Sequence, residues 1–127
     1  MKRGQMLLEV VLALAIVTIV MVALVQLSTR SIKNSDFSRY QAEATSYASQ
    51  AMEWIRADRN TKGWEEWWNN HPCGPVCDVI IGNRYTVHAG FTPTPGSPQR
   101  IAILVTVTWA QGGKSFSAKQ DAIFTQY

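Results

Sequence analysis

A long apolar run near the start of the chain constrains the fold more than any other feature. Two basic residues and Gly4 come first, and from Val10 to Val25 only Thr18 interrupts the apolar residues. Residues 6–27 would form a helix about 33 Å long at about 1.5 Å per residue. The hydrocarbon core of a bilayer is about 30 Å thick, so the run predicts a membrane-spanning helix over residues 5–27.

Glu9 is the exception within this segment. A carboxylate inside a membrane span costs roughly 2.5–3.5 kcal/mol on insertion scales, so we expect it to have a partner and a function. A cleaved secretory signal has a shorter apolar core, of about 7–15 residues, followed by a small-residue cleavage site. Here the core is longer, and residues 27–30 (Leu-Ser-Thr-Arg) do not provide such a site. An ordinary membrane anchor fits the length but gives no reason for Glu9.

The basic start, Gly4, Glu9 and the apolar run together resemble the prepilins of type IV pili and of type II secretion pseudopili. In that family a prepilin peptidase cuts after the glycine on the cytoplasmic side, and the fifth mature residue is glutamate. The resemblance makes residues 1–4 the cleaved leader and Gln5 the new N-terminus. The family usually has phenylalanine where this chain has Gln5, a departure that concerns N-methylation more than cleavage.

The resemblance also implies a role for Glu9, which in the family neutralises the amine of a neighbouring subunit's N-terminus, here that of Gln5. The implied partners are prepilin peptidase, other pilin or pseudopilin subunits, and the inner-membrane assembly platform. The implied product is a filament built by bundling the apolar helices.

Charge predicts the orientation of the chain in the membrane. The formal net charge is +3, with 12 basic and 9 acidic residues, and removal of Lys2 and Arg3 leaves 10 against 9. Under the positive-inside rule the basic leader stays in the cytoplasm, and the part after the span lies outside. We therefore expect a single-pass cytoplasmic membrane protein. Nucleic-acid binding needs a basic patch, which the basic isoelectric point of the precursor does not by itself supply.

Residues 28–60 carry a helical pattern that continues the span. Apolar residues recur there at steps of three and four, which predicts one buried face. Arg39 and Glu43 lie on the opposite, polar face and are spaced to pair. Neither glycine nor proline occurs from Gln5 to Lys62, so we expect one helix from about residue 5 to about 59; the alternative is an anchor joined to a separate helix. The predicted apolar face comprises Phe37, Tyr40, Ala44, Tyr47, Ala48, Ala51, Trp54 and Ile55.

Three tryptophans follow Gly63 within one helical turn, at positions 64, 67 and 68. Large aromatic side chains dominate protein cores and subunit contacts. We therefore expect the cluster to belong to the core. A platform for a carbohydrate or another ligand is the alternative.

Cys73 and Cys77 flank a tight loop that contains Gly74 and Pro75. Outside the cell this spacing predicts a disulfide, which contributes about 2 kcal/mol by the chain-entropy model. A zinc site that adds His71 and His88 is the alternative. The histidines do not have the spacing of a zinc-binding pair, so we expect neither a metal nor a cofactor.

The last part of the chain carries the signals of an antiparallel sheet. Residues 79–81 lead into a two-residue hairpin turn at Gly82-Asn83. Apolar and polar residues alternate over residues 84–91, which places His88 on the polar face of the strand. We expect residues 92–99, which are rich in proline, to form a loop and not a strand. Two further strands are predicted at residues 101–109 and 115–125.

These elements predict a globular domain at residues 61–127 with a sheet of about four strands. A domain of this size is marginally stable alone, so the sheet needs the apolar face of the helix as its second layer. The expected fold class is α+β: a long N-terminal helix packed against a C-terminal antiparallel sheet.

No pattern in the sequence indicates an enzyme: we find neither a glycine-rich phosphate loop nor a nucleophile–base spacing. Residues 105–109 (Val-Thr-Val-Thr-Trp), followed by Gly112-Gly113, resemble the late strand of minor pilins and minor pseudopilins. The resemblance therefore implies a structural minor subunit of a pilus, a secretion pseudopilus or a competence system. One alternative is a plain membrane-anchored domain. The other is a tip-located subunit that binds DNA or a surface through Arg84, His88, Arg100, Lys114 and Lys119.

Overall fold

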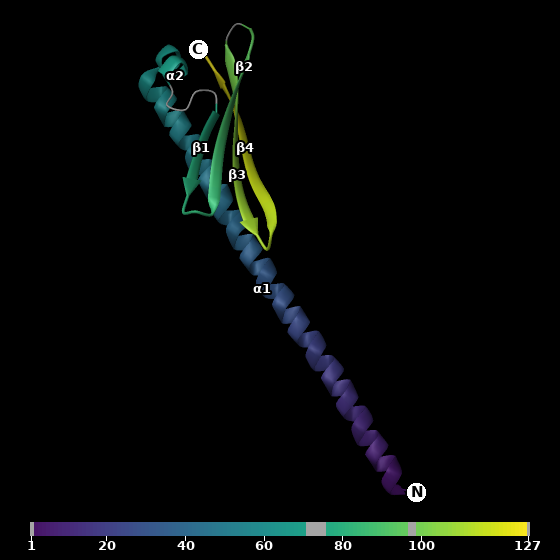
Figure 1. The fold of residues 1–127 in the computed structure, drawn as a ribbon. Helices are drawn as coiled ribbons and strands as arrows, with labels where there is room; N and C mark the ends of the chain where they lie inside the picture. Colours follow the sequence, from purple (N-terminus) through teal and green to yellow (C-terminus); the bar gives the residue numbers. More distant parts are fainter. Residues whose placement is uncertain (1, 71–75, 97–98, 127) are drawn as a thin grey trace. The chain divides into compact units, whose positions relative to one another are not determined.

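The computed structural model describes residues 2–70, 76–96 and 99–126, without the side chains of residues 2, 3, 76 and 77. The chain divides into two compact units, residues 1–38 and 39–127, and the second unit contains the sheet. Figure 1 shows the elements: helices α1 (Lys2–Lys62) and α2 (Trp64–Asn70), and strands β1 (Val76–Ile81), β2 (Tyr85–Thr94), β3 (Arg100–Gln111) and β4 (Lys114–Thr125). The expected α+β class is confirmed.

Helix α1 is one element of 61 residues, as the lack of glycine and proline after Gly4 predicts. It runs three residues past the expected end and stops at Gly63, whose φ is 75°. The Gly63 amide donates to the Arg59 carbonyl at 2.9 Å. A glycine in the left-handed conformation is a common C-terminal cap because it lacks a Cβ that would clash there.

The four strands form one antiparallel sheet in the order β1-β2-β3-β4. Gly82 and Asn83 turn the β1–β2 hairpin with φ values of 57° and 56°, the left-handed pair that a type I′ turn needs. The Arg84 amide donates to the Ile81 carbonyl at 3.3 Å. Because Ile81 pairs with Tyr85, Arg84 belongs to the turn, and β2 begins one residue later than expected.

The expectation that residues 92–99 form only a loop was wrong at its start. Residues 92–94 continue β2, and Pro93 pairs with Ile101 of β3. On the other side of β2, the described pairing with β1 ends at Gly90. Beyond Gly90, β3 is therefore the only strand that pairs with β2 among the described residues. A proline is tolerated in a strand when its nitrogen faces an open edge, where no N–H is needed.

The core lies between the inner face of the sheet and residues 39–62 of α1. The predicted alternation in β2 and β3 is confirmed, because Tyr85, Val87, Ala89 and Phe91 and every second residue from Ile101 to Trp109 are buried. The predicted helix face was only partly right. Trp54 is 56 % exposed, and Met52, which the sequence pattern did not single out, is fully buried. The buried positions on α1 form a narrow stripe of Ala44, Ala48, Met52 and Ile55.

Helix α2 closes one end of this core with Trp67, which is 1 % exposed. The rings of Phe91 and Phe124 each lie with their centroids 6.0 Å from that of Trp67. The expectation that the tryptophan cluster belongs to the core is confirmed for Trp67. Trp64 and Trp68 remain half-buried at the rim.

Candidate functional site

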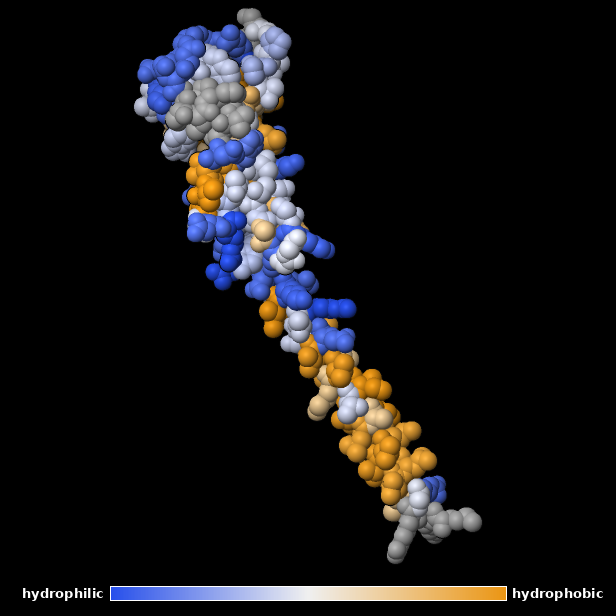
Figure 2. Space-filling view, viewed as in Figure 1, coloured by the Kyte–Doolittle hydropathy of each residue, from blue (hydrophilic) through white to orange (hydrophobic). Residues whose placement is uncertain are grey.

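The apolar segment of α1, residues 6–27, exposes its side chains on all sides. Its large apolar residues range from 50 % exposed at Val17 to 71 % at Met6. Figure 2 shows this segment as a stretch of apolar surface. Soluble monomers rarely expose a contiguous apolar patch of more than a few hundred Å². By length and composition, α1 is able to cross a membrane.

Within this segment the helix satisfies its own backbone groups and the hydroxyl of Thr18. A helix pairs its own backbone groups, which a spanning segment requires. The Thr18 hydroxyl donates to the Ala15 carbonyl at 2.8 Å, and just beyond the segment the Thr29 hydroxyl donates to the Val25 carbonyl at 2.9 Å. Glu9 has no hydrogen bond or ion pair with any described side chain. The charged group that needs an external partner is therefore the one that the sequence pattern identifies.

The predicted processing residues, Gly4 and Gln5, lie in the first turns of α1 and are exposed. Apart from its two chain neighbours and the adjacent backbone of the helix, no described atom lies within 4 Å of the position that a Cβ on Gly4 would occupy. A bulkier residue at position 4 is therefore compatible with the fold itself. A requirement for glycine here would come from a processing enzyme.

The predicted disulfide is not described, because Cys73 lies outside the described residues. Cys77 lies in β1, where it pairs with Ala89. His71, which the zinc alternative needs, also lies outside the described part of the chain. His88 is on the outer face of the sheet, with its Nδ1 2.6 Å from Asp78 Oδ1 on the neighbouring strand. The disulfide stays a prediction, and the described partner of His88 is a carboxylate.

A polar network that the sequence did not predict joins α1 to β2. The Tyr85 hydroxyl donates to Glu43 Oε2 at 2.7 Å, and Arg39 Nε donates to Glu43 Oε1 at 3.0 Å. The bonds from Tyr85 and Arg39 hold the pKa of Glu43 below its ordinary value. Burial, followed by the bond to Glu43, raises the pKa of Tyr85 to about 12. The Arg39–Glu43 pair was predicted, but Glu43 was expected to face away from the sheet.

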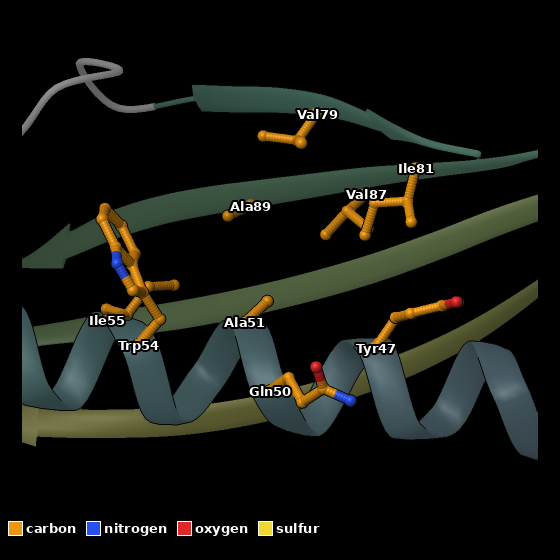
Figure 3. A pocket seen from close by; sticks show the side chains of 9 residues that line it. All are labelled: Tyr47, Gln50, Ala51, Trp54, Ile55, Val79, Ile81, Val87 and Ala89. Atoms are coloured by element: carbon orange, nitrogen blue, oxygen red, sulfur yellow. The ribbon is translucent and has the colours of Figure 1, made fainter. Parts of the chain in front are cut away.

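Beside this network, an apolar groove of about 410 Å³ opens between α1 and the first two strands. Figure 3 shows the small side chains of Ala51 and Ala89 between larger ones on both walls. The sequence pattern did not predict this groove, because it placed Trp54 on the buried face of the helix. The lining residues are Tyr47, Gln50, Ala51, Trp54 and Ile55 from α1 and Val79, Ile81, Val87 and Ala89 from the strands.

Comparison of the chain with protein-family models, with curated proteins and with solved structures found no match. The features that bear on function are therefore those of the chain itself. They are an apolar helical segment exposed on all sides, one carboxylate within it, and a small domain of a sheet and a helix.

Proposed function

We propose that this chain is a structural minor subunit of a type IV pilus or pseudopilus, cut after Gly4 by prepilin peptidase and assembled through its N-terminal helix. The observation that carries the proposal is Glu9. It is the only charged residue between Gly4 and Arg30, and the apolar side chains around it are exposed on every side of α1. A carboxylate at such a position is costly unless it has a partner.

In this proposal the apolar segment serves twice. It first holds the subunit in the cytoplasmic membrane, with the basic leader inside and residues 39–127 outside. It then packs against the same segments of neighbouring subunits in the filament. Lipid tails are as apolar as leucine, so hydrophobic burial alone does not favour the filament over the membrane. Helix packing and polar contacts must therefore favour the filament, and Glu9 is the charged group in the segment.

Cleavage would supply the partner of Glu9. Before cleavage, the backbone nitrogen of Gln5 belongs to a peptide bond and carries no charge. After cleavage it is an amine, which Glu9 of a neighbouring subunit can neutralise. A buried ion pair of this kind is better suited to fixing register than to adding stability. Cleavage also removes Lys2 and Arg3, the charges that hold the start of the segment at the cytoplasmic surface.

The test of the proposal is processing. In cells that contain the peptidase, N-terminal mass analysis should find a mature chain that begins at Gln5. A Gly4→Glu change should leave the precursor intact without disturbing the fold, because the Gly4 position is open. Wild-type chain that keeps residues 1–4 would point to a plain anchored domain. Cleavage of the Gly4→Glu variant at the wild-type rate would also reject the proposal.

A tip-located subunit that binds DNA or a surface has less support. The guanidinium of Arg84 lies 4.6 Å from the centroid of the Tyr40 ring, and His88 is paired with Asp78. Two of the five groups that this alternative uses are therefore engaged within the domain. DNA binding that weakens steeply with added salt would revive this alternative.

A further inference from the structure

Strand β1 is an edge of the sheet among the described residues, and its sequence lacks the lysine or proline that usually protects such an edge. Among the described residues, β2 is the only strand that pairs with it. Proteins commonly protect exposed edges with lysine or proline, because the unpaired backbone groups there invite another strand. The other edge, β4, carries Lys114 and Lys119, both exposed. The β1 sequence, Val-Cys-Asp-Val-Ile-Ile, has neither proline nor a basic residue and only one charge, Asp78.

The inner side of this edge opens into the apolar groove. Val79 lies on the core face opposite Val87, yet Val79 is 52 % exposed while Val87 is 6 % exposed. Figure 3 shows Val79 on the strand side and Trp54 on the helix side of the groove. When an extended peptide adds to a sheet edge, backbone hydrogen bonds supply affinity and pockets for alternate side chains supply specificity. A strand with one edge unpaired among the described residues, beside an apolar groove, provides both.

We propose that β1 accepts an extended segment of another protein as an additional antiparallel strand, whose alternate apolar side chains enter the groove between α1 and β1. Antiparallel pairing is slightly more stable per residue than parallel pairing. Directly opposed residues share a face, so the side chains opposite Val79 and Ile81 face the groove. The residue opposite Asp78 lies on the outer face, where a lysine or arginine would complement its charge.

A second copy of this chain fits the edge less well, and this step rests on the proposed membrane anchoring. Pairing β1 with the β1 of a second copy, antiparallel, reverses the direction of residues 39–62 of α1 in that copy. Pairing β1 with β4 of a second copy crosses four strand steps. At about 20–25° of twist per step, this rotates the second domain by roughly 80–100°. Neither arrangement suits two chains anchored in one membrane, whereas a single extended segment brings no sheet with it.

A designed peptide provides the probe. The sequence Phe-Thr-Val-Lys-Val-Thr, read antiparallel to β1, places apolar residues opposite Ile81 and Val79 and its lysine opposite Asp78. The control peptide, Thr-Thr-Phe-Val-Val-Lys, has the same composition without the alternation. Each is labelled with a fluorophore and titrated with the full chain in detergent micelles, and binding is followed by fluorescence anisotropy against empty micelles. We expect the full chain to bind the first peptide and not the second, with slower hydrogen exchange at the amides of residues 76–81.

Three variants identify the surface. Val79→Lys places a charge at the groove and should abolish binding, whereas Ile123→Lys, at a 70 % exposed position on β4, should leave it unchanged. Ala51→Leu fills the groove from the helix side and should also prevent binding while circular dichroism stays that of the wild type. Asp78→Lys should weaken binding about two- to five-fold, the range for exposed ion pairs. A peptide with aspartate in place of lysine should restore it.

Several results would overturn the proposal. They are equal binding of the two peptides, wild-type binding by the Val79→Lys chain, and protection of β4 instead of β1. A chain that binds neither peptide, and that is dimeric with its β1 amides already protected, would show that a second copy occupies the edge. None of these results depends on cleavage after Gly4. The processing assay and this assay therefore fail independently.

Discussion

Substitution of Glu9 can separate the cost of a carboxylate in a membrane span from its proposed role in filament assembly. Glu9→Leu removes a group that costs roughly 2.5–3.5 kcal/mol in a membrane span, so a plain anchor would insert at least as well. If Glu9 pairs with the amine of a neighbour's Gln5, the same change leaves that amine unpaired, at a cost of about 3–5 kcal/mol. We therefore expect normal insertion, normal cleavage after Gly4 and poor incorporation into the filament.

Three quantities measure this outcome: the fraction of chain bound to the membrane, the fraction that begins at Gln5, and the fraction found in sheared filaments. Glu9→Gln should give intermediate incorporation, because it keeps an acceptor without the charge. Thr18→Val is the matched control, since the Thr18 hydroxyl is already bonded to the Ala15 carbonyl and needs no partner. Incorporation of the Leu variant at the wild-type level would reject the pairing role.

The Tyr85–Glu43 bond predicts a pH dependence with a definite sign. Tyr85 has a pKa of about 12 in the folded chain, against an ordinary value of 10.0. The folded state therefore holds this proton more tightly than the unfolded state does. The stabilisation is complete below pH 10 and is lost as the pH rises from 10 to about 12.

The measurement is the difference in unfolding free energy between wild type and Tyr85→Phe, taken from pH 8 to 12.5 in micelles with tryptophan fluorescence as the signal. Phenylalanine keeps the ring beside Tyr47 and Trp109 but donates nothing to Glu43. The wild type should be the more stable chain at pH 8, and its advantage should shrink above pH 10. An advantage that stays constant to pH 12.5 would mean that the bond does not couple to folding.

Among the elements, α1 combines an exposed apolar segment with a second half that packs against the sheet. This second half buries a narrower stripe than the sequence pattern predicted. Met52 is fully buried, and Trp54 is 56 % exposed. Met52→Ala should therefore cost about 2–5 kcal/mol of unfolding free energy, the range for large-to-small changes in a core. Trp54→Ala should cost much less, because it removes a side chain from the rim of the groove. Urea unfolding of both variants tests this, and the reverse order would restore the stripe predicted from the sequence.

The same elements show what periodicity can and cannot predict. Alternation identified the buried face of β3, because every second residue from Ile101 to Trp109 meets one core. It did not show that β2 continues through Pro93, since that depends on the unequal lengths of β1 and β3. On α1, steps of three and four fit a stripe through Trp54 as well as one through Met52. Only the position of the sheet decides between them.

For the whole molecule, the candidate sites divide by how far apart their residues lie in the chain. Gly4, Gln5 and Glu9 fall within two helical turns, so the sequence alone was sufficient to single them out. The bond between Glu43 and Tyr85 joins residues 42 positions apart. The apolar groove likewise depends on how α1 lies against the sheet. Features of that kind depend on the packing of the elements, which the sequence predicted only as two layers.

The predicted disulfide tests on which side of the membrane the domain lies. Cys77 belongs to β1, so a bond to Cys73 would fix the loop before that strand. Closing so short a loop contributes about 2 kcal/mol by the chain-entropy model. We expect neither thiol to react with a maleimide in denatured chain prepared without reductant, and both to react after reduction. Replacing both cysteines with serine should lower the unfolding free energy by about the same 2 kcal/mol.

The Gly4→Glu precursor sharpens this test, because orientation and cleavage should be independent. The basic leader orients the chain by its charge whether or not it is later removed. The uncut precursor should therefore place residues 39–127 outside the cytoplasm and oxidise its cysteines as the wild type does. Two reactive thiols in the precursor alone would mean that cleavage precedes export of the domain. Reactive thiols in both chains, without bound zinc, would place the domain in the reducing cytoplasm and reject the proposed orientation. Reactive thiols together with bound zinc would support the metal alternative instead.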